Sequence, residues 1–345
     1  MKYFKYPFIV TLVALIFIAI WGYGEDKSIS GAFSALSITV ILIVMEVSLS
    51  FDNAVVNASI LRDWNDYWRR LFLTLGMIIA VFGMRLLFPI LIVSQTANKS
   101  MYEVWKLALD NPILYSQELT AHHTEISTFG GMFLLLVFLN FLFDSQKNIH
   151  WFSSFEERIS KLGEIDAVAT LIALYILVST IAFVPEDKLT LLIAGLWGIM
   201  VYLSVHAIGM VLEDISKDNA KIRAVSSVAK AGSIGGFLYL EILDASFSFD
   251  GVIGSFAITN DIVVIMVGLG IGAMFVRSMT IYLVDKGALD SYVYLEHGAH
   301  YAIGALAIIM IVSSIGFHIP EIITGLIGVS FILWAFSSSK KHKEL

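Results

Sequence analysis

Long apolar segments, separated by short polar ones, follow one another along the whole chain of 345 residues. A helix of about 20 apolar residues crosses a hydrocarbon core of about 30 Å, so each segment predicts a transmembrane helix. Charged residues, Gly, Pro and Asn mark the ends of the segments. The ten predicted spans are 6–24, 31–60, 71–94, 128–144, 166–184, 189–212, 229–258, 262–284, 298–316 and 320–337.

The placement of Lys and Arg tests this number of spans, because cytoplasmic loops collect basic residues. With the N-terminus inside, most of the 22 Lys and Arg fall in the inner segments. This asymmetry favours ten spans with both termini cytoplasmic. The shortest connections are Pro185-Glu186-Asp187 and His318-Ile319-Pro320. If either connection were itself helical, the two predicted spans on its sides would form one bent helix.

The composition agrees with an all-α polytopic membrane protein, a single transmembrane domain over 1–345. Hydrophobic residues make up 58% of the chain, charged residues make up 15%, and the mean hydropathy is +0.82, which together exclude an ordinary soluble protein. The absence of Cys excludes disulfides and thiolate metal sites, and the net charge of −7 gives no basic surface for nucleic acid. We also find no nucleophile and base pattern typical of an enzyme, and we expect no permanently bound cofactor.

One motif occurs twice, at an offset of 198 residues along the chain. Its pattern is acid-x-Ser-x-Ser-Phe-Asp, in spans two and seven. In each copy an Arg lies inside the following span, with about six extra residues before it in the first copy. The two copies are Glu46-Val47-Ser48-Leu49-Ser50-Phe51-Asp52-Asn53 with Arg85, and Asp244-Ala245-Ser246-Phe247-Ser248-Phe249-Asp250-Gly251 with Arg277.

The two motif spans lie five apart in the order of spans, so they are expected to cross the membrane in opposite directions. This predicts an inverted internal repeat of spans 2–4 and 7–9, an architecture that places substrate sites near the midplane. Repeat 1 then covers about 31–144, a helical hairpin about 166–212, repeat 2 about 229–316, and a C-terminal helix about 320–337.

The spacing of the acids predicts a break in both motif helices. Residues at i and i+6 lie about 240° apart on an ideal helix, so the two acids of one motif cannot share a face of a regular helix. Asn53 and Gly251, which follow the second acid of each copy, both tolerate non-helical backbone. We therefore expect interrupted helices.

Charged side chains inside the membrane are costly and mark functional sites. If all the predicted intramembrane acids ionise, Arg85 and Arg277 leave an excess of negative charge that protons or a bound cation must neutralise. The structural interpretation of the two Arg is that they pair with two of the acids and fix helix packing. The five acids are Glu46, Asp52, Glu241, Asp244 and Asp250.

The available donors are carboxylates, an Asn carbonyl, hydroxyls and freed backbone oxygens, a set that suits Mg²⁺, Ca²⁺ or Mn²⁺. Acids without metal can hold protons, so we also hypothesise proton coupling. The hydroxyls are expected to act as ligands or to support them; they belong to Ser48, Ser50, Ser246 and Ser248.

Histidines are few. His122-His123 lie in the long outer loop, about 95–127, which we expect to be a solvated lid, with metal collection as the alternative. His206, His297 and His300 are expected to be hydrogen-bonded side chains rather than ligands.

The two motif copies, each followed one helix later by an Arg, resemble the paired signatures of the TerC family, within the LysE-type transporter superfamily. Members of that family are linked to manganese efflux and to tellurium-resistance loci. The resemblance implies a cation exporter that uses these acids. Together with the inverted repeat, it favours a divalent-cation exporter that works by alternating access in the bacterial cytoplasmic membrane, with Mn²⁺ as the leading candidate and Ca²⁺ or Mg²⁺ as alternatives. By position it implies an ion site of Glu46, Asp52, Asn53, Asp244 and Asp250.

Two features depart from the family pattern and indicate a divergent branch. Gly251 stands where many TerC relatives have Ser, and ten spans exceed the usual seven. Two other functions stay open. An exporter of a cationic metabolite, such as a basic amino acid, would need a roomier site with aromatic side chains. A membrane scaffold or assembly factor would use the buried acids for packing alone.

Overall fold

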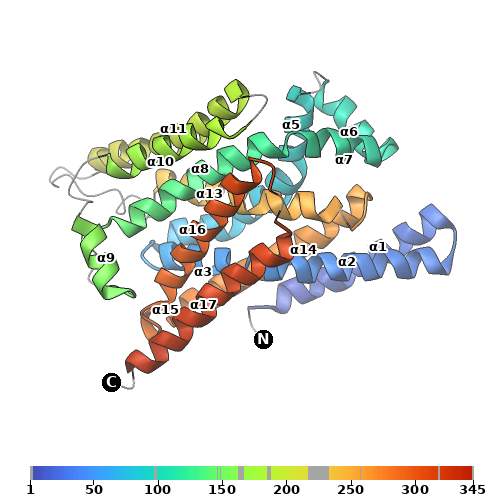
Figure 1. Ribbon diagram of the computed structural model, residues 1–345. Coiled ribbons are helices and arrows are strands. Elements are labelled where there is room, and N and C mark those ends of the chain that lie inside the picture. Colours follow the sequence, from blue (N-terminus) through green and yellow to red (C-terminus); the bar gives the residue numbers. More distant parts are fainter. Residues whose placement is uncertain are drawn as a thin grey trace.

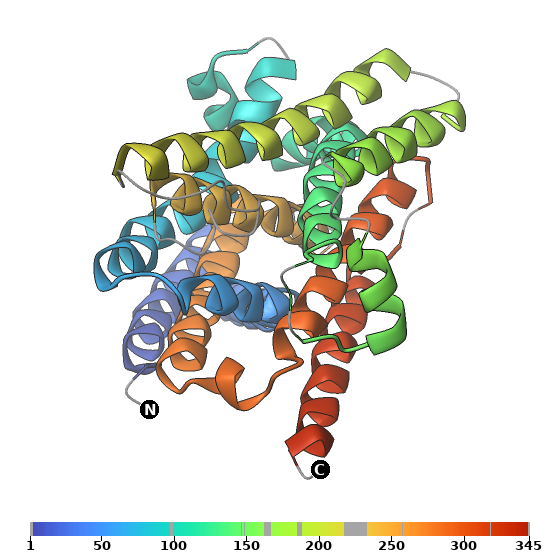
Figure 2. The same ribbon diagram turned by 90° about the vertical axis from the view of Figure 1, so that its left-hand side faces the viewer.

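The computed structural model describes residues 3–96, 99–145, 147, 149–161, 167–184, 188–216, 233–256, 258–317 and 319–343. Over these ranges the chain is helical and has no strand, and the helices pack into one bundle (Figures 1 and 2). Two segments, η1 and η2, are π-helices. The elements are α1 (Lys5–Asp26), α2 (Ile29–Leu49), α3 (Phe51–Leu61), α4 (Asp66–Leu71), η1 (Phe72–Gly76), η2 (Ile79–Leu87), α5 (Phe88–Thr96), α6 (Met101–Asp110), α7 (Pro112–Ala121), α8 (His123–Leu142), α9 (Ser153–Ser160), α10 (Val168–Ala182), α11 (Lys188–Ser216), α13 (Ile234–Phe256), α14 (Ile262–Asp285), α15 (Ala288–Ser291), α16 (Leu295–Ser313) and α17 (Glu321–Lys343).

Within the described ranges, eight helical stretches are long and apolar enough to cross a membrane. This confirms the predicted all-α polytopic membrane protein. The eight are Lys5–Asp26, Ile29–Leu49, Asp66–Leu91, His123–Leu142, Lys188–Ala207, Ile262–Asp285, Leu295–Ser313 and Ile323–His342.

The other two predicted spans are also helical but differ from these eight. Helix α10 has 15 residues, which is about 23 Å of helix and less than the thickness of the hydrocarbon core. Helix α13 has 23 residues and is long enough, but three acids reduce its apolar character. All ten predicted segments therefore form helices, of which eight meet both requirements of a membrane span.

The two short connections separate distinct helices. Helix α16 ends at Ser313 and α17 begins at Glu321, with Gly316 in a left-handed conformation at φ 93° between them. Helices α10 and α11 are likewise separate, although Pro185-Glu186-Asp187 between them lies outside the described residues.

Most of the segment over about 95–127, predicted as a solvated lid, forms helices α6 and α7, and its role as a lid stays a prediction. Two of its polar residues are helix caps. The Ser100 hydroxyl accepts a bond from the backbone N–H of Glu103 in a capping box, and the Asn111 side chain accepts from the N–H of Leu114. One apolar face of the two helices is buried, with Val104, Ala108, Tyr115 and Leu119, whereas other apolar residues such as Tyr102 and Ile113 are exposed.

Each motif helix packs against the Arg-bearing helix of the other repeat. Helix α2 packs along α14, and α13 packs against η2. Close approach of α2 and α14 depends on Gly268, which faces Leu42, and Gly272, which faces the Glu46 side chain. The helices of the two motif copies thus pack against each other next to Glu46, the first acid of copy one.

Helices α8 and α16 form an antiparallel pair. Gly131 lies against Ala307 and Met310, whereas Phe138, further along α8, lies against Gly304. Still further along, the Phe141 ring stacks on His300 with 3.9 Å between ring centroids. The start of α8 therefore lies beside the end of α16, and the end of α8 lies beside the start of α16.

We predict that Gly272→Ala lowers the stability of the detergent-solubilised protein by about 1–3 kcal/mol, the usual effect of overpacking a tight contact. A Cβ at this position would lie too close to the Cβ and Cγ of Glu46 for any side chain to fit unmoved. Gly24→Ala is the matched control, because a Cβ there has no atom within 4 Å. Thermal unfolding of both variants measures the effect, and equal melting temperatures would contradict the packing argument.

Candidate functional site

The first motif helix is interrupted at Ser50. Helix α2 ends at Leu49, Ser50 has φ −100° and ψ 16°, and α3 begins at Phe51. The predicted break is confirmed in this copy. In the second copy it is wrong, because α13 runs unbroken from Ile234 to Phe256. The side chain of Asp250, in α13, lies outside the described part.

The first acid of copy one is paired with the Arg of the same copy. Glu46 is 1% exposed, and its Oε1 accepts from the Ser50 hydroxyl at 3.0 Å and from Arg85 Nη2. Arg85 Nη1 also donates to the carbonyl oxygen of Ala80 at 2.7 Å. Arg85 lies in η2, and π-helical segments are frequent at functional sites.

Copy two repeats this arrangement. Arg277 Nη2 lies 2.9 Å from Asp244 Oδ2, and its guanidinium stacks on the Phe72 ring at 3.8 Å from the centroid. The Asn53 side-chain amide donates to the other oxygen of Asp244, so a residue of copy one binds the acid of copy two. The interpretation of both Arg as ion-pair partners of two acids is therefore supported.

Glu241 lies beside the second pair and forms a longer ion pair with the same Arg277. Its Oε1 is 3.8 Å from Arg277 Nη2, and neither carboxylate oxygen has a hydrogen-bond partner among the described residues. Gly76 of η1 packs directly on this carboxylate. Asn57, one turn after Asn53, is also fully buried, and its amide has no partner in the described ranges.

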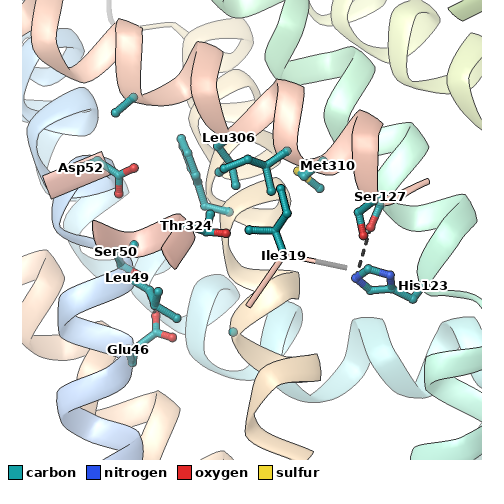
Figure 3. Close-up of a pocket in the computed structure, with 16 residues that line it drawn as sticks. Glu46, Leu49, Ser50, Asp52, His123, Ser127, Leu306, Met310, Ile319 and Thr324 are labelled. Atoms are coloured by element: carbon teal, nitrogen blue, oxygen red, sulfur yellow. Dashed lines mark hydrogen bonds between the residues drawn. The ribbon is translucent and has the colours of Figure 1, made fainter. Parts of the chain in front are cut away.

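Asp52 and Glu46 both line one cavity, which lies between α2, α3, α8, α13, α16 and α17 (Figure 3). Asp52 is 7% exposed, and its Oδ1 accepts a 2.8 Å bond from the Asn53 backbone N–H. The cavity volume is about 50 Å³, room for a few waters at roughly 10–15 Å³ each. The other polar side chains that line it are Ser50, His123, Ser127, Ser313 and Thr324.

The predicted ion-site residues are thus divided between two places. Glu46 and Asp52 face the cavity, while Asn53 and Asp244 bind each other. In the part of the chain that the structure describes, no group of three or more His, Asp and Glu side chains could hold a metal ion. The four predicted residues whose side chains the structure describes, Glu46, Asp52, Asn53 and Asp244, do not form one coordination sphere in this conformation, and the five-residue ion site stays a prediction.

The four motif serines have different surroundings. Ser50 donates to Glu46, Ser246 donates to the Ile242 carbonyl of its own helix at 3.0 Å, and buried Ser248 has no partner in the described ranges. Ser48 is exposed and does not face Glu46 in this conformation, so its supporting role stays a prediction. It lies two residues from Glu46, about 200° around the helix.

The histidine predictions are confirmed at two positions. His297 and His300 bond the backbone oxygens of Ile149 and Glu296, each at 2.8 Å. His206 does not follow the prediction, since its Nε2 has no partner among the described residues. At the start of α8, His123 Nε2 lies 3.3 Å from the Ser127 hydroxyl, and both side chains line the cavity.

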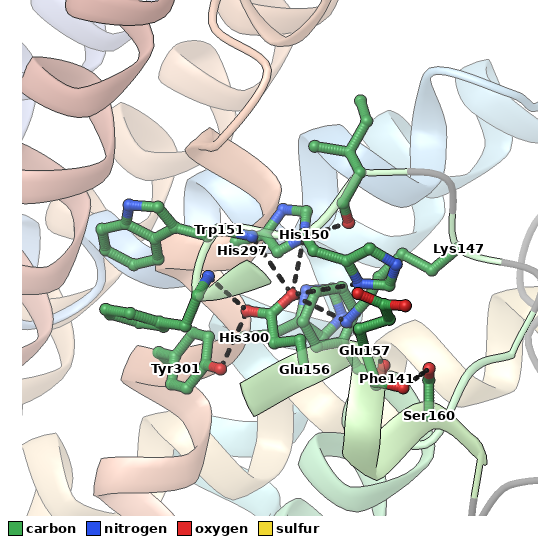
Figure 4. A network of polar contacts seen from close by, with 12 residues as sticks. Phe141, Lys147, His150, Trp151, Glu156, Glu157, Ser160, His297, His300 and Tyr301 are labelled. Atoms are coloured by element: carbon green, nitrogen blue, oxygen red, sulfur yellow. Dashed lines mark hydrogen bonds and ion pairs between the residues drawn. The ribbon is translucent and has the colours of Figure 1, made fainter. Parts of the chain in front are cut away.

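One buried acid, Glu156 in α9, has no counterpart in the sequence-based prediction (Figure 4). Its side chain is fully buried and bonds to α16 and to the segment between α8 and α9. No spacing in the sequence indicates this cluster, because its members come from two segments about 150 residues apart. The distances to Glu156 are 3.3 Å from Lys147 Nζ, 3.7 Å from His150 Nδ1, 3.5 Å from His297 Nε2, 2.9 Å from the Tyr301 hydroxyl, and 3.2 and 3.4 Å from the backbone N–H groups of Trp151 and Phe152.

These partners keep Glu156 ionised. Burial acts to raise the pKa of Glu156, but the contacts with His297, Lys147 and Tyr301 outweigh it and lower the pKa from 4.5 to about 2. Because the folded pKa lies below the unfolded one, the cluster stabilises the fold fully above about pH 4.5, and this contribution is lost as the pH falls towards 2.

We predict that Glu46→Gln and Arg85→Gln each destabilise the protein by about 3–5 kcal/mol, because each leaves a buried charge without its partner. The double variant Glu46→Gln/Arg85→Gln removes both charges and is expected to recover much of the loss. Thermal unfolding in detergent measures the three variants as a cycle. Additive losses would contradict a paired interaction.

We also predict that the stability difference between wild type and Glu156→Gln is largest at neutral pH and shrinks as the pH falls below about 4.5. Unfolding temperatures measured between pH 7 and pH 3 test this. Glu157→Gln, which changes the exposed neighbouring acid, is the control and is expected to be almost neutral throughout. A pH-independent difference for Glu156→Gln would refute the assignment.

Comparison with known protein families shows which family this chain belongs to. No curated protein and no solved structure matches the chain. The profile of one family, described as "Protein of unknown function (DUF475)", matches residues 51–344, from α3 to the end of α17. The match includes Asp52, the whole second motif and both Arg. This polytopic membrane protein therefore belongs to the DUF475 family.

Proposed function

We propose that this protein transports a divalent metal cation through the membrane by alternating access, with Mn²⁺ as the preferred ion. The observation that carries the proposal is Asp52, a buried carboxylate in the cavity wall. In the described ranges it forms no ion pair, whereas Glu46 and Asp244 each bind an Arg.

An unpaired carboxylate inside a membrane protein requires a compensating charge. A cation in the cavity supplies it, because Asp52 and Glu46 are both part of the cavity wall and Ser50 and Thr324 add hydroxyl oxygens. Oxygen donors of this kind suit Mn²⁺, Mg²⁺ and Ca²⁺. The resemblance to the TerC family favours Mn²⁺ and the direction of export.

The size of the cavity favours a single ion over a cationic metabolite. At about 50 Å³ it accommodates a few waters or a partly hydrated ion. A basic amino acid has more heavy atoms than this space accepts. The acid site is also not surrounded by aromatic side chains, since Phe247 is the one aromatic residue in the cavity wall.

The interlocked repeats support alternating access. Each motif helix packs against the Arg helix of the other repeat, and Asn53 joins the two copies at Asp244. A rearrangement of one repeat against the other would therefore act on the acids directly. We place the protein in the bacterial cytoplasmic membrane with both termini inside, as the distribution of basic residues favours, and we propose no enzymatic activity.

We predict that purified wild-type protein in liposomes moves Mn²⁺ down an imposed gradient and that Asp52→Asn reduces the initial rate by at least about tenfold, because it removes the charge that compensates the ion. Asp66→Asn is the matched control, since this acid at the start of α4 has an 84% exposed side chain. A metal-sensitive dye inside the liposomes measures the flux, with Ca²⁺ and Mg²⁺ as competitors.

Absence of flux for all three metals would refute the transport proposal, and equal flux in wild type and Asp52→Asn would refute the assigned site. The same liposomes test proton coupling. An imposed pH gradient is expected to drive Mn²⁺ movement, and a flux insensitive to that gradient would remove the coupling.

A membrane scaffold is the second candidate, favoured by the pairing of Glu46 with Arg85 and of Asp244 with Arg277. Such pairs fix helix packing without transport. For a scaffold, Asp52→Asn would leave the protein folded and no variant would affect metal flux, whereas loss of either ion pair would still destabilise it.

A further inference from the structure

The Glu156 cluster lies at one end of the pair of helices α8 and α16, and the acid-lined cavity runs along α16 from Ala302, next to Tyr301 of the cluster, to Ser313 near the other end. Helices α8 and α16 are antiparallel, and the cavity is lined by His123 and Ser127 at the start of α8 and by Met310 and Ser313 near the end of α16. The cluster takes Tyr301 and His297 from the first two turns of α16. The cavity therefore reaches the end of the helix pair that lies away from the cluster.

The basic residues indicate which side is which. Lys147, a member of the cluster, and Arg158, on α9, belong to a connection that the distribution of charge places inside, while His123 falls on the outer side. The cavity then extends from Glu46 and Asp52 towards the outer side, and the cluster lies on the inner side of the same helices.

The cluster joins segments that are otherwise separate. Through Glu156 it holds α9 and the segment before it against α16. The same end of α16 is held to the end of α3 by the Arg62 and Glu296 pair at 3.7 Å. Aromatic rings seal the contact: the Trp151 ring lies 5.8 Å from Tyr301 and 5.0 Å from Trp334 of α17, centroid to centroid.

We propose that the Glu156 cluster is the inner gate of the transport path, closed in this conformation while the cavity reaches the outer side. This inference rests on the proposed transport function. Opening the gate means separating Glu156 from its partners on α16, and a fully buried carboxylate that loses part of its partners is strongly destabilised in place. The cluster therefore stabilises the inward-closed state relative to the inward-open one.

Cysteine labelling tests the gate directly, because the chain has no Cys of its own. Ala302→Cys places a thiol on α16 in the cavity wall, one residue beyond Tyr301. Ser313→Cys places a thiol in the outer part of the cavity. Ag⁺, a thiol-reactive cation small enough for the cavity, is applied from the outer side in intact cells and from the inner side in inverted membrane vesicles, and the thiols left unreacted are counted with a maleimide after denaturation.

We expect Ala302→Cys alone to react from the outer side and to be protected from the inner side. Adding Glu156→Gln is expected to raise the rate of inner labelling by about tenfold or more, since it removes the charge that holds the gate. Glu157→Gln, the exposed neighbour on α9, is expected to leave the rate unchanged. Ser313→Cys is expected to react from the outer side in every background.

Tyr301→Phe keeps the test decisive if Glu156→Gln does not fold. It removes one hydroxyl, whose bond to Glu156 is 2.9 Å, and is expected to raise inner labelling by a smaller factor. The proposal is overturned if Ala302→Cys already reacts equally from both sides. It is also overturned if folded Glu156→Gln or Tyr301→Phe proteins label like their parent, or if Glu157→Gln has the same effect as Glu156→Gln.

Labelling does not depend on metal movement, so the two proposals fail separately. If the labelling is as expected but no Mn²⁺ moves in liposomes, the proposal that Mn²⁺ is the transported ion is refuted and the proposal that the Glu156 cluster is the gate is retained. A protein that moves Mn²⁺ with unchanged labelling keeps the transport function and refutes the gate.

Discussion

Charge buried in an apolar bundle has to be neutralised, and the arrangement of the central helices follows from how this is done. An ionised side chain at mid-membrane costs at least about 2.5–3.5 kcal/mol on insertion scales. Here Glu46 binds Arg85 and Asp244 binds Arg277, which requires each motif helix to lie next to the following span of its own copy. Glycines allow helices of the other copy to approach as closely: Gly272 at Glu46 and Gly76 at Glu241.

Pairing with Arg neutralises some of the acids, whereas Asp52 has no ion pair among the described residues. Asp52 is held by the backbone N–H of Asn53 and faces the cavity, so its position is fixed without its charge being neutralised. Asn53 also bonds Asp244 through its side chain. Asn53 therefore connects Asp52, which faces the cavity, to Asp244, which pairs with Arg277 in the other copy. A movement of either copy would change the surroundings of both carboxylates.

The sequence predicts most of the helices, because length and apolar composition decide what can cross a membrane. It also predicts the repeat, whose shared acids and Arg stand out from apolar filler, and the interruption near Ser50. It does not identify α6 and α7, because the polar residues that suggest a loop are their caps. Nor does it indicate which acids the two Arg bind, or the cluster of Glu156 with His297 and Tyr301, since such contacts depend on tertiary packing.

The two copies of the motif have diverged in the shape of their backbones. Copy one has a helix interrupted at Ser50 and then two π-helical segments, whereas copy two has the continuous helices α13 and α14. A regular helix resists bending, and π-helical turns and breaks are where helices bend easily. The backbone of copy one therefore offers more places to bend than that of copy two, so the two copies differ in shape although they share their acids.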